Sequence, residues 1–447
     1  MLLTEQAHHP DVRQPHGAAP SVPQADAPLL AALGEETVGY RSISLVYPGQ
    51  PDFTSCDPDS SNVPLKDREL VVHLWYPGEA SGGAPRATYS GTMVSDPPGG
   101  RVAFAVPGIA FANLLSRGRG WPLVVVSPGY GNSPVAMTWL TENLASKGYV
   151  VACVEHFDPN AYAETFPTIA GPLYYRPTDI AFVVARLKAM LGELIDGERI
   201  ALIGYSMGGY AAFTGGGAEI DPSSPALFAL PGDWLRQLAR GGAQAGDIAV
   251  PGVKAVVAIA PGGNGVPMLF GEPCLAAIET PLLMIAGELD ARIDYQNEML
   301  RYFTSARRAD RYLLTFLMAT HIIGLNPVPL GMHGSMWDMG WFADPVWRTE
   351  RVNAINQHFI TAFLDAKIKG VDEAQSYLDV PVRRSHEGVW HPPHLVAFDA
   401  CSPGGDSVTL WKGFQRGNAV GLEMQFEAAA APDDGEQSIA PGLERIA

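Results

Sequence analysis

One short segment constrains the fold more than any other, because an apolar strand runs directly into a serine flanked by glycines. The strand Ile200–Ile203 is followed by Gly204-Tyr-Ser-Met-Gly208 and then by the helix-forming run Tyr210–Phe213. Glycines two residues before and after a serine permit a turn so sharp that side chains at those positions would collide. The segment therefore predicts a strand, a strained turn and a helix, with the Ser206 hydroxyl lifted clear of a sheet. The five-residue motif alone is weak, and its alternative is an ordinary glycine-rich turn.

Strands and helices alternate on both sides of this segment. The helix that begins at Pro177 carries apolar residues at helical spacing as far as Leu191. The other expected strands are Leu123–Ser127, Val150–Glu155, Val253–Ala260, Leu282–Ala286 and Tyr312–Phe316, and the other expected helices are Val135–Lys147 and Trp347–Lys367. Such alternation favours the α/β class, with a mostly parallel central sheet flanked by helices.

The domain organisation follows from shifts in composition along the chain. An early pair of strands, Thr37–Val46 and Leu70–Tyr76, opens the ordered region. The expected divisions are a flexible N-terminal tail at 1–36, one α/β domain at 37–370 with a glycine- and proline-rich insertion or cap at 215–252, a C-terminal extension packed on the core at 371–427, and an acidic tail at 428–447. The extension has strand-like pieces at 407–414 and 420–426, which suggest an added hairpin.

Charge and hydropathy exclude several classes of partner. The formal net charge is −17, which argues against a general affinity for nucleic acid or for an anionic membrane surface. No apolar stretch approaches the length of a spanning helix, so we expect a soluble protein without a membrane span. The start of the chain lacks a secretory signal. The compartment stays open: secreted or periplasmic if a signal was removed, and cytoplasmic otherwise.

Neither the cysteines nor the histidines form a metal-binding signature. The 4 cysteines contain no CxxC pair, and they are compatible with two disulfides or none. Cys153 lies in an apolar run, which favours a buried thiol. His386, His391 and His394 lie near Glu387, but their spacing fits no zinc signature and two prolines break any helix that would align them. We therefore expect no metal.

A serine hydroxyl is a poor nucleophile and needs a base that is itself oriented by a carboxylate. After a serine turn of this kind, the expected order along the chain is serine, acid, histidine. Asp290 follows the strand ending at Ala286, and the carboxyl ends of such strands meet ligands. Asp290 is preferred as the acid over Glu288 in the same turn, and Asp294 is expected to be a surface residue.

His321 follows the strand Tyr312–Phe316 and is the expected base. His333 is its rival, but it lies in a loop farther from any strand and is better suited to a supporting or lid role. His156 lies close to the rim of the sheet, and the alternative to a lining role is a hydrogen-bonded structural histidine. His156, His333 and Trp337 are the candidates for lining a substrate site.

An oxyanion formed on attack by a serine needs two N–H donors. Met207, directly after the serine, supplies one candidate. The tight loop Pro128–Ser133 follows an early strand, and the backbone N–H of Tyr130 is the second candidate. The alternative for this loop is a simple turn.

With these residues in place, the chain resembles the platelet-activating-factor acetylhydrolase and dienelactone-hydrolase-like branch of the α/β hydrolases. The similar stretches are Leu74–Pro77, Pro128–Gly131, Leu144–Tyr149, Val154–His156, Arg176–Asp179, Gly204–Gly209, Gly287–Asp290 and Ala319–His321. The resemblance implies the α/β-hydrolase fold, no cofactor, and hydrolysis of a small-molecule carboxylic ester through an acyl-enzyme, with Ser206, Asp290 and His321 matching the triad. The chain departs from true dienelactone hydrolases, which use a cysteine nucleophile, and from the many relatives that carry His-Gly in the oxyanion loop.

Apolar residues just after the candidate base bear on the substrate. The stretch Ile322–Leu330 and the residues Met332, Met336, Trp337, Met339 and Trp341 predict either an apolar rim for an acyl or aryl group, or simply core. The same triad would also serve an amidase, a peptidase or an acyltransferase. A binding protein on a hydrolase scaffold is the alternative from outside enzymes.

Overall fold

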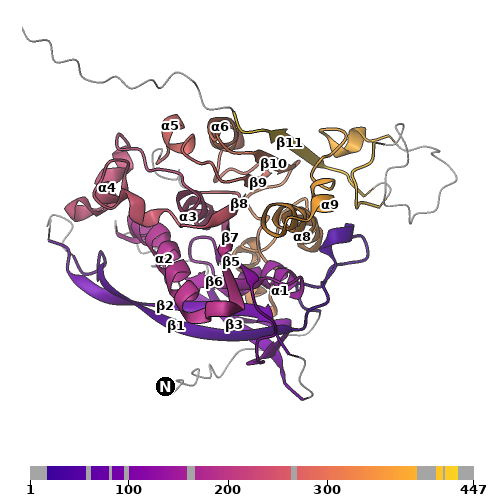
Figure 1. Ribbon diagram of the computed structural model, residues 1–447, viewed down its shortest axis with the longest axis horizontal. Helices are drawn as coiled ribbons and strands as arrows, with labels where there is room; N and C mark the ends of the chain where they lie inside the picture. The colour runs from indigo at the N-terminus through magenta and orange to yellow at the C-terminus, as the bar shows by residue number, and fades with distance from the viewer. Residues whose placement is uncertain are drawn as a thin grey trace, which may run out of the picture.

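An eleven-stranded sheet runs through the centre of the protein in this computed structural model (Figure 1). The structure describes residues 18–56, 62–79, 83–94, 100–158, 167–262, 269–389, 409–415 and 418–430. The strand order is β11-β10-β9-β8-β7-β5-β6-β2-β1-β4-β3. The six strands from β5 to β10 are parallel, and β2 and β11 pair with the two ends of this block in the antiparallel direction. The predicted mostly parallel central sheet is confirmed.

The central strands match the predicted apolar runs closely. Their bounds are β5 Trp121–Ser127, β6 Val150–Glu155, β7 Ile195–Tyr205, β8 Val253–Ile259, β9 Leu282–Gly287 and β10 Arg311–Phe316. The outer strands are β1 Val38–Pro51, β2 Leu65–Pro77, β3 Arg86–Val94, β4 Arg101–Ala112 and β11 Leu422–Glu427. Strands β3 and β4, which extend the sheet beyond β1, were not predicted from the sequence.

Helices cover both faces of the sheet (Figure 1). One face carries α1 (Thr138–Ser146), α8 (Thr349–Leu364) and α9 (Asp372–Gln375), and the other carries α2 (Pro167–Leu191), α3 (Met207–Gly215), α4 (Trp234–Leu238) and α6 (Leu300–Ser305). Two short helices, α5 (Glu272–Leu275) and α7 (Met336–Gly340), lie in connecting segments. Among the described residues, no helix has the length and apolar character that crossing a membrane requires.

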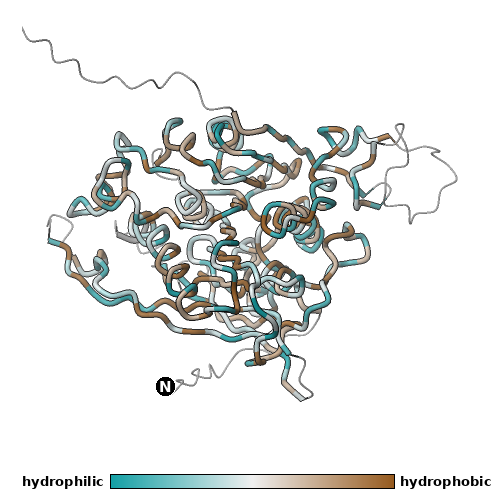
Figure 2. The backbone as a smooth tube through the Cα atoms, in the orientation of Figure 1, coloured by the Kyte–Doolittle hydropathy of each residue, from teal (hydrophilic) through white to brown (hydrophobic). Residues whose placement is uncertain are grey.

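Each central strand contributes to two cores. In β5, Val124 and Val126 belong to the core under α1 and α8, whereas Leu123 and Val125 belong to the core under α2 and α3. Successive side chains of a strand point to opposite faces, so a strand covered on both sides must be apolar throughout. Figure 2 shows the resulting hydrophobic stretches along the strands and the helices beside them.

The strand order reverses its direction at β5. This strand lies between β6 and β7, so the connections that leave β5 and β6 pass to opposite sides of the sheet. Such a switch point leaves a crevice at the carboxyl ends of the strands, where α/β proteins bind ligands. The loop after β5 and the turn after β7 meet at this place.

The N-terminal segment differs from its prediction. Ser21 is fully buried and its hydroxyl donates to Glu142 at 2.6 Å. The backbone N–H of Leu30 donates to the His358 ring of α8 at 3.1 Å. The prediction of a flexible tail is therefore wrong for residues 18–36, which pack on the α1 and α8 layer; residues 1–17 lie outside the described part.

The C-terminal extension packs on the core, but not as a hairpin. β11 pairs with β10, and the ring of Phe426 lies 4.6 Å from that of Tyr312. Residues 409–414 form no strand. Instead Trp411 is buried and packs against Phe359 of α8, with ring centroids 5.9 Å apart.

The predicted insertion is part of the helical layer. Within 215–252, α4 packs on α2, where the ring of Trp234 lies 5.8 Å from that of Tyr174. Leu235 and Leu238 are buried in the same core. The segment thus thickens the layer that covers this face of the sheet.

The helix α2 begins before its predicted start and continues through Pro177. A proline inside a helix removes one N–H donor and leaves the carbonyl four residues earlier without its helical partner. That carbonyl belongs to Leu173, and the Tyr210 hydroxyl of α3 donates to it at 2.8 Å. The carbonyl that Pro177 leaves unpaired in α2 is thus hydrogen-bonded to α3, the helix that follows the serine turn.

We predict that Tyr210→Phe lowers the free energy of unfolding by about 1–3 kcal/mol, because it leaves the buried Leu173 carbonyl without a donor. Tyr302→Phe is the matched control, since Tyr302 is equally buried and its hydroxyl has no partner among the described residues. Urea denaturation of both variants measures the difference. An equal effect of the two substitutions would contradict a stabilising role of the hydrogen bond from Tyr210 to the Leu173 carbonyl.

Candidate active site

Ser206 occupies a strained turn between β7 and α3. Its backbone angles are φ 52° and ψ −121°, in a region that residues with a side chain rarely adopt. A Cβ added to Gly204 would lie 2.0 Å from the carbonyl oxygen of Gly208, and one added to Gly208 would lie 1.9 Å from that of Ser127. Both flanking glycines are therefore sterically required, as the motif predicts, and the turn presses against the end of β5.

The structure brings Ser206, His321 and Asp290 together. The Ser206 Oγ lies 2.9 Å from His321 Nε2, and His321 Nδ1 lies 2.6 Å from Asp290 Oδ2. A carboxylate only accepts hydrogen bonds, so Nδ1 carries the proton and donates to Asp290. In the neutral ring Nε2 then accepts from the serine hydroxyl. The three residues follow β7, β10 and β9, whose carboxyl ends share one edge of the sheet.

Backbone donors fix the carboxylate in place. Asp290 Oδ1 accepts the N–H groups of Arg292 at 2.8 Å and Ile293 at 2.9 Å, which leaves Oδ2 for the histidine. The alternative acids are engaged elsewhere: Glu288 accepts the N–H of Met318, and Asp294 caps the turn that follows it. The geometry thus singles out Asp290 among the three carboxylates.

Two supporting residues were missed in the sequence analysis. Tyr205 stacks on the His321 ring with centroids 5.4 Å apart, and its hydroxyl donates to the His321 carbonyl at 3.2 Å. The N–H of Gly262 donates to the Ser206 carbonyl at 2.7 Å, and a Cβ on Gly262 would lie 3.2 Å from the Met207 nitrogen. The position of Gly262 directly after the apolar strand β8 was the available signal.

The two candidate oxyanion donors lie in segments that contact each other. Met207 begins α3, where the first N–H groups of a helix have no intrahelical acceptor. The loop that contains Tyr130 follows β5, and its Gly129 packs against the ring of Tyr205. The loop and the serine turn are therefore adjacent.

The three candidate lining residues occupy three different environments. His156 is buried and both ring nitrogens are engaged, with Ser127 and Asp179. His333 is exposed and borders a cavity of about 330 Å³ together with the N-terminal segment. Trp337 borders a cavity of about 350 Å³ together with Trp341 and with Arg292, two residues after Asp290.

The apolar residues after His321 divide between core and surface. Ile323, Leu325 and Met332 are buried in the core. Met336 is 80% exposed and Trp337 is 66% exposed, and both border the cavity beside Arg292. The core alternative therefore holds for the buried residues, and the apolar rim stays a prediction for the exposed ones.

Among the described residues, no group of histidine, cysteine or acidic side chains has a geometry that could hold a metal ion. Of the histidines that were considered as ligands, His391 and His394 lie outside the described residues. Cys56, Cys153 and Cys274 are free thiols, and burial raises the pKa of Cys153 well above its usual value. Cys401 lies outside the described part.

Comparison with known proteins supports the α/β-hydrolase fold expected from the sequence. The family described as PETase, PET hydrolase-like, matches residues 115–230. A ferulic acid esterase from Streptomyces cinnamoneus superposes with a TM-score of 0.51 at 22% identity, over 76% of this chain and 93% of that one. The topology and these matches define the class of structure: the chain has the α/β-hydrolase fold.

Within that class, the sequence is similar to bacterial cutinases over a short region. Cutinase 1 of Thermobifida cellulosilytica is 29% identical over 90 residues, which are 19% of this chain and 30% of that protein. The cutinase of Thermobifida fusca is 29% identical over 90 residues, 27% of its length. The chain thus spans less than a third of the curated relatives that it matches.

We predict that a fluorophosphonate probe labels Ser206 and leaves Ser127 unmodified. Both serines contact a histidine that contacts an aspartate, but Ser127 is 2% exposed at the end of a strand, whereas Ser206 is partly exposed on the turn. Peptide mass spectrometry of the labelled native protein locates the adduct, with urea-unfolded protein as the control. An adduct on Ser127, or on neither serine, would count against the site.

Proposed function

We propose that the protein is a serine hydrolase that cleaves carboxylic esters through an acyl-enzyme. The observation that carries the proposal is the chain of contacts from Ser206 through His321 to Asp290, at 2.9 Å and 2.6 Å, on a strained turn at the carboxyl edge of the sheet. This arrangement supplies a nucleophile, a base and an orienting carboxylate within hydrogen-bond reach.

In the first half of the reaction, the Ser206 Oγ attacks the ester carbonyl carbon while His321 Nε2 takes the hydroxyl proton. Asp290 stabilises the imidazolium and holds the ring in its orientation. The N–H groups of Met207 and Tyr130 receive the oxyanion. Collapse of the tetrahedral intermediate expels the alcohol, which takes the proton from His321.

In the second half, water attacks the acyl-enzyme and His321 again serves as the base. The acid product leaves and Ser206 regains its proton. Both halves use residues of this chain alone. The proposal agrees with the names of the relatives matched by sequence, a PET hydrolase-like family and two cutinases, all of which denote hydrolysis.

The substrate that this site favours has an apolar acyl or aryl group. Trp337, Met336 and Trp341 border the cavity beside Arg292, whose backbone N–H holds the acid of the triad. The guanidinium of Arg292 lies 5.5 Å from the centre of the Trp341 ring. Exposed aromatic and thioether groups around a cavity that Arg292, two residues after Asp290, also borders offer an apolar surface to a bound chain or ring.

We expect wild-type protein to hydrolyse nitrophenyl esters, and Ser206→Ala to reduce the rate to background. Initial rates with acyl chains of two to twelve carbons measure both the activity and the size of the acyl site. Nitroanilides of the same acyl groups, and an added alcohol as acceptor, separate an esterase from an amidase and an acyltransferase. Turnover of anilides in preference to esters would overturn the ester assignment.

We expect Asp290→Asn to lower kcat by about 10⁴-fold, because an amide at this position favours the wrong tautomer of the histidine. Asp294→Asn is the control, since Asp294 is exposed and its partners among the described residues belong to its own turn. Steady-state kinetics on the best nitrophenyl ester compare the two variants. Equal activity of Asp290→Asn and Asp294→Asn would exclude Asp290 as the acid.

A further inference from the structure

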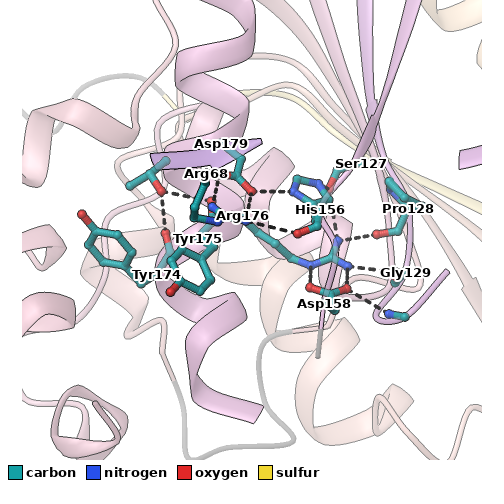
Figure 3. Close-up of polar contacts among 12 residues, drawn as sticks. Arg68, Ser127, Pro128, Gly129, His156, Asp158, Tyr174, Tyr175, Arg176 and Asp179 are labelled. Carbon is teal, nitrogen blue, oxygen red and sulfur yellow. Dashed lines mark hydrogen bonds and ion pairs between the residues drawn. The ribbon is translucent and has the colours of Figure 1, made fainter. Parts of the chain in front are cut away.

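A buried arginine of α2 holds the loop that follows β5 (Figure 3). Arg176 is fully buried. Its Nη1 donates to the carbonyl of Pro128 at 2.5 Å and to the Ser127 hydroxyl at 3.3 Å, and its Nη2 donates to the carbonyl of Gly129 at 2.9 Å. Three consecutive residues, the last of β5 and the first two of the loop, are thus bound to one guanidinium group.

Asp158 closes this arrangement from the other side. It accepts from Arg176 Nε at 3.3 Å and from Nη2, and it accepts the backbone N–H of Gly131 at 2.9 Å. Burial opposes ionisation of the Asp158 carboxyl, but the adjoining guanidinium outweighs that effect and keeps its pKa below the usual value. The carbonyls of the loop therefore accept hydrogen bonds from the Arg176 cation, and one of its N–H groups donates to the Asp158 anion.

The guanidinium has no donor left for a ligand. Its five N–H groups are accounted for by Ser127, Pro128, Gly129 and two contacts with Asp158. Arg176 therefore does not reach a substrate itself. Arg176 can therefore affect a reaction only through the position of the loop that it binds.

The ion pair of Arg176 and Asp158, here called the clamp, is joined to a second set of polar contacts (Figure 3). His156 Nε2 accepts from the Ser127 hydroxyl at 2.9 Å, and its Nδ1 donates to Asp179 at 2.9 Å. Arg68 of β2 donates to the same aspartate at 2.5 Å and to the His156 carbonyl at 3.1 Å. Burial lowers the pKa of His156, and the nearby Arg176 lowers it further, so the ring is neutral in this network.

The clamped loop presses on the serine turn. A Cβ on Gly208 would lie 1.9 Å from the Ser127 carbonyl oxygen and 2.8 Å from that of Pro128. Gly129 lies against the Tyr205 ring, which in turn stacks on His321. A shift of the loop by a fraction of an ångström would therefore change the position of the Tyr130 N–H relative to the Ser206 hydroxyl.

We propose that Arg176 and Asp158 are positioning residues, which fix the loop of residues 128–131 so that the Tyr130 N–H meets the oxyanion formed on attack by Ser206. This inference rests on the proposed function. It assigns a role to the Arg176–Asp179 and Val154–His156 stretches, which the triad and the oxyanion donors leave unexplained.

The test compares Arg176→Lys with Arg311→Lys. Arg311 is also buried and also binds carbonyl oxygens and a carboxylate, but at the start of β10, the end opposite His321. A lysine has three donors on a point charge and cannot reproduce the planar fork. We expect Arg176→Lys to lower kcat about tenfold to hundredfold with KM nearly unchanged, since a misplaced oxyanion donor acts on the transition state.

Two further readouts separate positioning from loss of stability. The affinity for a trifluoromethyl ketone, which forms an oxyanion on Ser206, should fall by the same factor as kcat/KM. Hydrogen exchange of the peptide spanning residues 127–133 should become faster in Arg176→Lys and not in Arg311→Lys. Asp158→Asn retains an acceptor for Gly131 and serves as a second, milder variant if Arg176→Lys does not fold.

Kinetics of Arg176→Lys or Asp158→Asn that match the wild type, or a loss of kcat no larger than that of Arg311→Lys at equal thermal stability, would overturn the clamp. A wild-type protein that turns over no ester would overturn the proposed function itself. Wild-type turnover with unchanged kinetics in the two clamp variants overturns the clamp alone.

Discussion

The arrangement of the site depends on one steric constraint, the contact between the serine turn and the end of β5. The Gly208 backbone lies so close to the Ser127 carbonyl that a methyl group would not fit between them. This approach sets the position of the loop after β5 relative to Ser206 and draws β5 and β7 together at the switch point of the sheet. Gly208 therefore serves a tertiary contact, whereas Gly204 serves the local turn.

Packing two backbones together in this way has an electrostatic consequence. The carbonyls of Pro128 and Gly129 are removed from water beside the turn, and buried acceptors need donors. A guanidinium supplies several donors in one plane, but burying its charge requires a carboxylate nearby. Asp158 meets that need and, by binding Gly131, ties the charge pair to the same loop. The ion pair thus binds both carbonyl and N–H groups of one loop.

The sequence predicts those parts of the fold and site that depend on neighbouring residues. The serine turn, the acid and base after β9 and β10, and the central strands follow from local patterns. The clamp does not, because Arg176 and Gly129 lie 47 residues apart and only the packing of α2 unites them. The burial of Ser21 against Glu142, 121 residues away, was missed for the same reason. The prolines of α2 concealed its first turns, since they are atypical of a helix interior.

The molecule contains two sets of contacts from serine to histidine to aspartate, and their environments separate their roles. Ser127 ends a buried strand, and its hydroxyl oxygen also receives a hydrogen bond from Arg176. A cation beside His156 opposes the imidazolium that a base must form. Ser206 stands on a turn with positive φ, and the carboxylate of Asp290 faces the far side of His321. These environments favour Ser206 over Ser127 as the nucleophile of the proposed reaction, so residue types alone do not define the site.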